Sequence, residues 1–129
     1  MERAELDRVQ LYLRRLFGNH EIRVTARPQR EDLAEVHIGS ELVGMLSVDD
    51  EDGDRSYNLQ VGVQEARFDR AQEALRKLFG NPNIRVLPRP RKTDSADVQI
   101  GEEFIAVLFL EDGERSYSFQ MAILDTDLE

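Results

Sequence analysis

The two halves of this chain carry nearly the same sequence. Three short segments recur in the same order, and they are Leu-Phe-Gly-Asn (16–19 and 78–81), Ile-Arg-Val (22–24 and 84–86) and Arg-Ser-Tyr (55–57 and 115–117). The spacing is 62 residues at first, as from Gly18 to Gly80, and 60 residues later, as from Tyr57 to Tyr117. A duplication of this kind predicts one structural unit used twice, with an approximate two-fold axis between the copies.

The length of the chain limits how the two copies can fold. Each copy has about 60 residues, and a domain of that size buries only roughly 60% of its unfolded surface, which makes it marginal alone. We therefore predict two half-domains, residues 1–64 and 65–129, that complete each other as one pseudo-dimer. Because one repeat buries too little surface alone, we expect a single repeat to form a homodimer. The full chain should be a monomer, because its two repeats already cover each other.

Composition and charge argue against several classes of protein. The 129 residues include no cysteine, which excludes disulfides and thiolate metal ligands and fits a reducing compartment. The first residues do not resemble a signal peptide, and no apolar run approaches the ~20 residues of a membrane span, so we expect a cytoplasmic protein that does not enter a membrane. Residues 1–64 hold 8 basic and 13 acidic side chains (−5), and residues 65–129 hold 9 and 13 (−4). This negative charge opposes non-specific binding to phosphate backbones.

Each half is predicted to begin with an amphipathic helix, about 2–17 in the first half. Apolar residues recur there at the i, i+3, i+4 and i+7 positions that form one helix face. The apolar positions are Leu6, Val9, Leu13, Leu16 and Phe17, matched in the second half by Phe68, Ala71, Leu75, Leu78 and Phe79. Gly18 and Gly80 follow the two helices and are suited to end them.

Four strands are predicted after each helix. A polar loop containing proline (28–32 and 88–94) is expected between the first two strands. The third strands, 42–48 and 104–110, are almost continuously apolar, which predicts central strands covered on both faces. In the fourth strands, apolar and polar residues alternate along the chain. Tyr57 and Tyr117 lie in the apolar register, and Gln60 and Gln120 lie in the polar one. The predicted fold class is thus α+β: two tandem α-β-β-β-β repeats, each an antiparallel sheet covered by one helix.

The second half resembles a known family of small domains. The residues that carry the resemblance are Leu-Phe-Gly-Asn-Pro-Asn-Ile-Arg-Val at 78–86, Pro-Arg-Pro-Arg-Lys at 88–92 and Ser-Tyr-Ser-Phe-Gln-Met-Ala-Ile-Leu-Asp at 116–125. They are similar to the alphaproteobacterial family named domain of unknown function 3126, whose typical members hold one repeat. The first half is a looser match, because His20 stands where the second half has Pro82. The resemblance implies a bacterial cytosolic protein and supplies no function.

Arginines recur at matched places in the two halves and form the candidate binding site. The candidate anion- or partner-binding residues are Arg23, Arg27, Arg55, Arg85, Arg89, Arg91, Lys92 and Arg115. Arginine forks bind phosphate and carboxylate groups bidentately, so two such clusters would suit an anion or an acidic peptide. The favoured alternative is structural, namely ion pairs with the carboxylates nearby, such as Asp32, Glu35, Asp94 and Asp97.

No catalytic, metal or cofactor site is predicted. The acidic run at 49–54 does not fit a calcium loop, because counting from its glycine places Val48 at the first ligand position and Leu59 at the twelfth. His20 and His37 lack the spacing of metal ligands and have no nucleophile beside them in the sequence. Glycine-rich phosphate loops and nucleophile elbows are absent from the sequence. We therefore predict a protein that is not an enzyme.

The function predicted from the sequence is an adaptor that binds another protein. Each fourth strand is expected at a sheet edge, where an extended segment of a partner can add. The runner-up is a pseudo-dimer that binds single-stranded nucleic acid across its sheet, a hypothesis based on fold analogy alone. A third hypothesis, a sensor of a small molecule or an anion, requires an enclosed pocket between helix and sheet.

Overall fold

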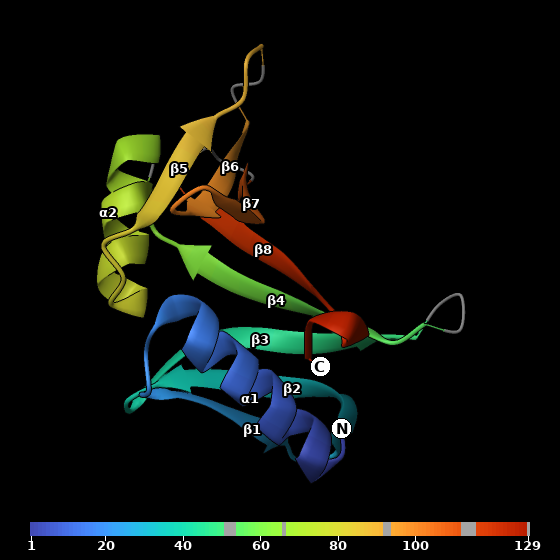
Figure 1. Ribbon diagram of the computed structural model, residues 1–129. Coiled ribbons are helices and arrows are strands. Elements are labelled where there is room, and N and C mark those ends of the chain that lie inside the picture. The colour runs from blue at the N-terminus through green and yellow to red at the C-terminus, as the bar shows by residue number, and fades with distance from the viewer. Residues whose placement is uncertain (51–53, 66, 92–93, 112–115, 129) are drawn as a thin grey trace. The chain divides into compact units, whose positions relative to one another are not determined.

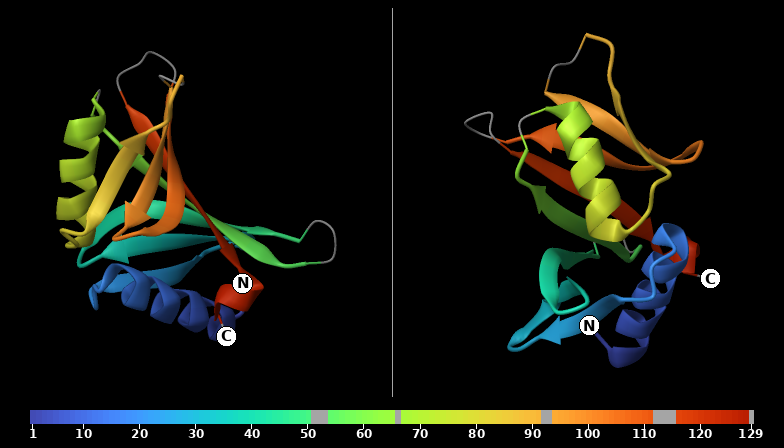
Figure 2. Two further views of the ribbon diagram at one scale, coloured as in Figure 1. Left: turned by 45° about the horizontal axis from the view of Figure 1, so that its top comes forward. Right: turned by 90° about the vertical axis from the view of Figure 1, so that its left-hand side faces the viewer.

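A computed structural model describes residues 1–50, 54–65, 67–91, 94–111 and 116–128 (Figures 1 and 2). The elements in chain order are α1 (Arg3–Phe17), β1 (Ile22–Arg27), β2 (Arg30–Ile38), β3 (Glu41–Asp49), β4 (Ser56–Val63), α2 (Phe68–Phe79), β5 (Ile84–Pro88), β6 (Ser95–Ile100), β7 (Glu103–Leu110), β8 (Tyr117–Leu124) and the 3-10 helix η2 (Asp125–Leu128). The described chain therefore has the predicted order of one helix and four strands, twice. The short helix η2 was not predicted.

The strands are antiparallel and follow the order β1-β2-β3-β4-β8-β7-β6-β5 in one sheet. The α+β class and the antiparallel meander of each repeat are confirmed. The prediction of one separate sheet per repeat is wrong, because β4 and β8 are neighbours in the strand order. The prediction that the fourth strands form edges is wrong for the same reason. The edge strands are β1 and β5.

The chain divides into two compact units that do not follow the sequence repeats strictly. Unit 1 contains Met1–Gln60 and Ala122–Glu129, and unit 2 contains Val61–Met121. The end of β4 thus belongs to unit 2, and the end of β8 belongs to unit 1 with η2. Sequence analysis placed the division after residue 64. The compact units instead exchange the ends of their fourth strands.

The apolar face of each helix packs onto the strands of its own unit. Val9, Leu13 and Phe17 of α1 are buried, and Gly18 ends the helix in the left-handed conformation at φ 64°. In unit 2, α2 lies along β5 and ends at Gly80 in the same way (Figure 2). Only glycine adopts this conformation freely, so the prediction of both helix ends is confirmed.

The strands reproduce the predicted alternation best at the end of each repeat. The buried positions of the fourth strands are Tyr57, Leu59, Val61 and Val63 in β4 and Tyr117, Phe119, Met121 and Ile123 in β8. Gln60 is exposed and Gln120 is half-buried, as their register predicts. Because successive strand side chains point to opposite faces, this pattern places one face of β4 and β8 in the core.

Two predictions about the other strands are wrong. Within the described residues the third strands are covered on one face only, and Leu42 (52%), Phe104 (55%) and Phe109 (39%) stay exposed. One helix per unit covers one sheet face, so the apolar run does not imply burial on both. The first polar loop is also shorter than predicted, because Gln29 adopts a φ of 66° and lets β2 begin at Arg30.

Candidate functional site

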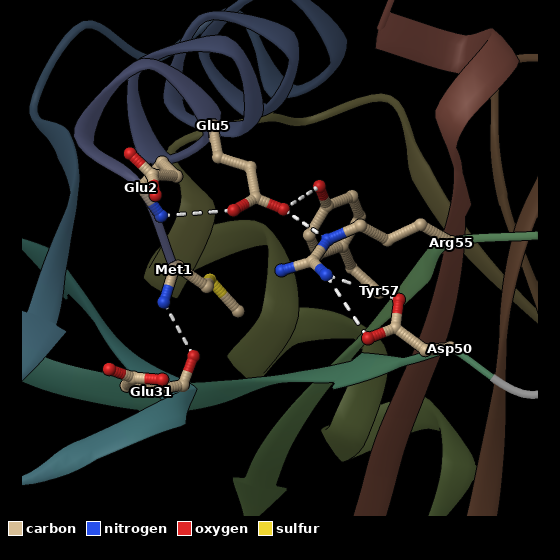
Figure 3. Close-up of polar contacts among 7 residues, drawn as sticks. All are labelled: Met1, Glu2, Glu5, Glu31, Asp50, Arg55 and Tyr57. Carbon is tan, nitrogen blue, oxygen red and sulfur yellow. Dashed lines mark hydrogen bonds and ion pairs between the residues drawn. The ribbon is translucent and has the colours of Figure 1, made fainter.

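An open groove in unit 1 gathers acidic side chains around one arginine (Figure 3). Its volume is about 660 Å³, and its lining residues are Met1, Glu2, Glu5, Glu31, Asp32, Val48, Asp50 and Arg55. They come from the start of α1, the start of β2 and the residues that flank the loop between β3 and β4. The groove is therefore built where four elements of the first repeat begin or end, namely α1, β2, β3 and β4.

Glu5 is the centre of the polar network in this groove. Its side chain is buried, and its Oε2 accepts a hydrogen bond of 2.6 Å from the hydroxyl of Tyr57. The same oxygen pairs with Nε of Arg55, and Oε1 accepts the backbone N–H of Glu2 at 3.0 Å. Arg55 also donates through Nη1 to both carboxylate oxygens of Asp50, at 3.1 Å each (Figure 3). Both acceptor oxygens of the buried carboxylate are thus occupied, as a buried charge requires.

The network fixes the protonation states of its members. Burial alone would raise the pKa of Glu5, but hydrogen bonds from Tyr57, Arg55 and the backbone of Glu2 outweigh it and lower that pKa. The hydrogen bond to Glu5 raises the pKa of Arg55. Burial, followed by the bond to Glu5, raises the pKa of Tyr57. Near neutral pH the carboxylate and the guanidinium are charged and the phenol is neutral, which is the state that binds the three groups together.

We expect Glu5→Gln to make the stability of the protein less dependent on acid pH. The folded pKa of Glu5 lies below its unfolded value of about 4.3. Its contribution is therefore present above that value and is lost as the pH falls through the folded pKa. At pH 7 the variant should be less stable by about 1–2 kcal/mol, because it keeps an acceptor oxygen and loses the charge.

Urea unfolding between pH 3 and pH 7 measures this difference. Asp7→Asn, at an exposed position of the same helix, is the matched control and should keep the wild-type dependence on pH. If the difference in the free energy of unfolding between wild type and Glu5→Gln stays constant down to pH 3, the charge of Glu5 contributes nothing to stability.

The second repeat differs from the first at the place of Glu5. Tyr117 occupies the place of Tyr57, but its ring stacks on Phe68, with 5.0 Å between ring centroids and 25° between planes. At the spacing of 62 residues, Arg67 stands where the first repeat has Glu5. Burial, and then the charge of Asp69, raises the pKa of Tyr117. The prediction that both tyrosines belong to the core is confirmed, since they are 1% and 4% exposed.

The structure places the predicted arginines in several different environments. Arg23 and Arg85 each donate to a turn carbonyl, Gly39 at 2.8 Å and Gly101 at 3.3 Å. Arg27 lies 3.8 Å from the sulfur of Met45. These contacts leave the arginines exposed along the edge strands β1 and β5.

The remaining candidates are paired, exposed or outside the description. Arg55 is the arginine of the groove, and Arg89 pairs with Asp97 at 2.7 Å. Arg91 is exposed and adopts a φ of 66°. Lys92 and Arg115 lie outside the described residues. Ion pairing with nearby carboxylates, the favoured structural alternative, thus holds for Arg55 and Arg89.

A second candidate surface lies on the sheet of unit 2, on the face opposite α2. We call it the aromatic face and define it by Leu87, Phe104, Val107 and Phe109. The register places these residues on one face, because Leu87 and Val107 both pair with Asp97, Phe104 pairs with Gln99 and Phe109 with Ser95. Ala96 and Val98, the intervening positions of β6, are buried on the helix side. In unit 1, Leu42 and Ser47 stand at the positions of the two phenylalanines.

Sequence reasoning identified Arg55 of the groove but missed its carboxylate partner Glu5 and the whole aromatic face. Glu5 was interpreted only as part of an amphipathic helix, although the change from Glu5 to Arg67 between the repeats was a visible signal. Phe104 and Phe109 were assigned to the core because β7 is apolar throughout. Unequal residues at matched positions (Leu42 against Phe104, Ser47 against Phe109) were the signal that could have identified the aromatic face.

The described part of the chain contains neither a metal-ligand cluster nor a membrane-spanning helix. There, no group of three or more His, Asp or Glu side chains is arranged to hold a metal ion. His37 contacts Glu35, with 3.2 Å between Nε2 and Oε1, and His20 is exposed. No helix among the described residues combines the length and the apolar character needed to cross a bilayer.

Comparison with protein families assigns both halves of the chain to one family. The model described as "Protein of unknown function (DUF3126)" matches residues 5–66 and, a second time, residues 68–127. Comparisons with curated proteins and with solved structures give no match. The two matched segments cover nearly the whole chain and coincide with the internal repeats. The protein therefore belongs to the DUF3126 family and contains two tandem copies of its domain.

Proposed function

We propose that this protein is a protein-binding module and that the aromatic face of unit 2 is its contact surface. The observation that carries the proposal is the exposure of two phenylalanines, Phe104 (55%) and Phe109 (39%), on one sheet face. Single exposed apolar residues are ordinary, but several grouped on one face commonly indicate an interaction site. Large aromatic side chains also contribute a disproportionate share of binding energy in protein interfaces.

The surroundings of the aromatic face suit a protein partner. Gln99 and Gln120 share the face, since they pair with Phe104 and Val107 respectively. The ion pair between Arg89 and Asp97 lies beside Leu87. Protein interfaces typically combine an apolar centre with a polar rim of this composition. The exposed rings would be buried by the partner, which would contribute the free energy of removing apolar surface from water.

The test compares partner capture by the wild type and by Phe104→Ser/Phe109→Ser. Both proteins would be immobilised and incubated with a lysate of the source cells, with and without nuclease, and bound proteins would be quantified by mass spectrometry. We expect a partner that the double variant loses at least about tenfold, equivalent to ~1.4 kcal/mol. Leu42→Ser is the matched control, because Leu42 has the same place in unit 1 and is 52% exposed. Capture unchanged by the double variant would contradict the proposal.

Binding of single-stranded nucleic acid is a second candidate, favoured by the same two rings. Aromatic side chains on an open sheet can stack bases, and Arg85 lies in the register of this face through its pairing with Gln99. The net charge of −9 opposes it. We expect a labelled single-stranded DNA to bind no more tightly than ~10⁻⁴ M at ~0.1 M salt. Micromolar binding lost in Phe104→Ser/Phe109→Ser would favour nucleic acid over a protein partner.

A further inference from the structure

In both units, two side chains of the helix form hydrogen bonds with backbone groups of the edge strand. In unit 1, Nε of Arg14 donates to the carbonyl of Ile22 at 2.7 Å, and Oε1 of Gln10 accepts the N–H of Val24 at 2.9 Å. In unit 2, Nε of Arg76 donates in the same way to the carbonyl of Ile84 at 2.7 Å, and Oε1 of Gln72 accepts the N–H of Val86 at 2.9 Å. Two side chains of each helix thus occupy backbone groups that an edge strand would otherwise present to another chain.

The two edge strands differ at their next outward-facing position, where β5 has no backbone donor and β1 has one. In an antiparallel pair, alternate residues direct both backbone groups away from the neighbouring strand. After Val86 the next such position on β5 is Pro88, which has no N–H. After Val24 the next such position on β1 is Ala26. Ala26 and Pro88 occupy matched positions, because Ala26 pairs with Ala34 on β2 and Pro88 pairs with Ala96 on β6. Ala26 is exposed, and the alternation directs its N–H outward. The register shifts directly after it, between Ala26 and Arg27.

A groove runs beside the unprotected part of β1. Its volume is about 410 Å³, and its lining residues are Met1, Arg3, Leu6, Asp7, Val24, Thr25 and Ala26. Figure 1 shows α1 next to β1, and β1 is the edge strand of unit 1. Leu6 and Val24 give the groove an apolar part, whereas Asp7 would repel a second carboxylate there.

The opposite side of β1 is basic. Arg23 lies in the register that points away from α1. The register shifts between Ala26 and Arg27, but Arg27 contacts the sulfur of Met45, which lies on the same side through its pairing with Glu35. Both arginines are exposed. Within the described residues neither of them forms an ion pair with a carboxylate. Side chains of a strand added to β1 would alternate between the groove and this basic side. Carboxylates on the basic side would form favourable cross-strand pairs with the two arginines.

We propose that the edge of β1 at Val24–Ala26 binds an extended segment of a partner protein by strand addition. The segment has alternating apolar and acidic side chains, with the apolar ones in the groove beside Leu6 and the acidic ones opposite Arg23 and Arg27. Backbone hydrogen bonds to Ala26 give affinity, and the alternation gives specificity. This site lies in unit 1 and does not depend on the aromatic face of unit 2.

The test uses a fluorescein-labelled peptide, Glu-Val-Glu-Val-Glu-Val-Glu, and follows fluorescence anisotropy with the full chain. We expect Ala26→Pro to weaken binding at least about tenfold, because it removes the outward N–H. Proline already occupies the matched position 88, so the fold should tolerate it, and circular dichroism checks this. Arg27→Glu should weaken binding roughly threefold to tenfold, and a peptide with lysine in place of glutamate should bind more weakly than the acidic one.

A second measurement locates the peptide directly. Saturating peptide should slow hydrogen exchange of the Ala26 amide and leave that of Leu87 on β5 unchanged. Phe104→Ser/Phe109→Ser should bind the peptide like the wild type, so failure of the aromatic-face proposal and failure of this one are distinguishable. Equal binding by the wild type and a folded Ala26→Pro, or no binding at ~1 mM protein, would overturn the proposal. A full-length dimer that Ala26→Pro abolishes would also overturn it, because a second copy would then occupy the edge.

Discussion

Truncation of Phe79 to alanine should lower the free energy of unfolding by about 3–5 kcal/mol, the usual range for a buried aromatic residue. Phe79 is the last residue of α2 and is 1% exposed. Its ring contacts that of Phe119 on β8, with 5.7 Å between centroids and 46° between planes. The variant therefore loses apolar burial and an aromatic contact, and it leaves a cavity between helix and sheet.

Gln120→Ala is the control for this prediction. Gln120 follows Phe119 directly, but it lies on the opposite face of β8 and is half-buried. Its substitution should cost less than about 1 kcal/mol, as surface changes usually do. Urea unfolding of both variants at one pH provides the comparison. Similar losses at Phe79 and Gln120 would be incompatible with the burial pattern of β8.

Expression of residues 67–129 alone should give a homodimer. In the full chain β8 has β7 and β4 as neighbours, so removal of the first half leaves one side of β8 without a strand. A second copy of β8 can take the place of β4 and restore the pairing through a two-fold axis. The isolated repeat would also lack Val61–Glu65, which belong to unit 2 in the full chain.

Multi-angle light scattering distinguishes the possible outcomes. We expect twice the repeat mass for residues 67–129 and the monomer mass for the full chain at micromolar concentration. The melting temperature of the half should rise with its concentration, because dimerisation and folding are then linked. A monomeric half with a cooperative melt independent of concentration would show that the repeats fold independently.

Local patterns were sufficient to predict the elements of each repeat. The helix faces of α1 and α2 follow from the period of 3.6 residues, and Gly18 and Gly80 mark their ends because each adopts a positive φ. The fourth strands follow from strict alternation, which gives Tyr57 and Tyr117 the buried register. Each of these features depends on residues close together in the sequence.

Features that depend on distant residues were not predictable in this way. The neighbours of β4 and β8 are set by pairing between the repeats, for which neither strand carries a local signal. The bond between Glu5 and Tyr57 joins residues 52 positions apart. A continuous apolar run such as β7 does not reveal whether one sheet face or both are covered, so the exposure of Phe104 was missed.

The arginines show the same limit for the candidate site. Their repetition showed that both halves need a cation at those places, without specifying its partner. Arg23 and Arg85 share the same role at a turn carbonyl, whereas Arg55 depends on Glu5, which the second repeat replaces by Arg67. Side-chain geometry, which distinguishes these roles, is fixed only once the sheet is assembled.

The exchange of strand ends between the units affects how the chain can fold during its synthesis. Unit 1 contains Met1–Gln60 but also needs the last strand end and η2, where Leu128 is buried. Those residues leave the ribosome long after Gln60, roughly 3 to 14 s later at synthesis rates of about 5–20 residues per second. Unit 2, by contrast, is contiguous from Val61 to Met121. During synthesis, the first half therefore keeps part of its core exposed until the last residues have been made. Unit 1 is begun first and completed last.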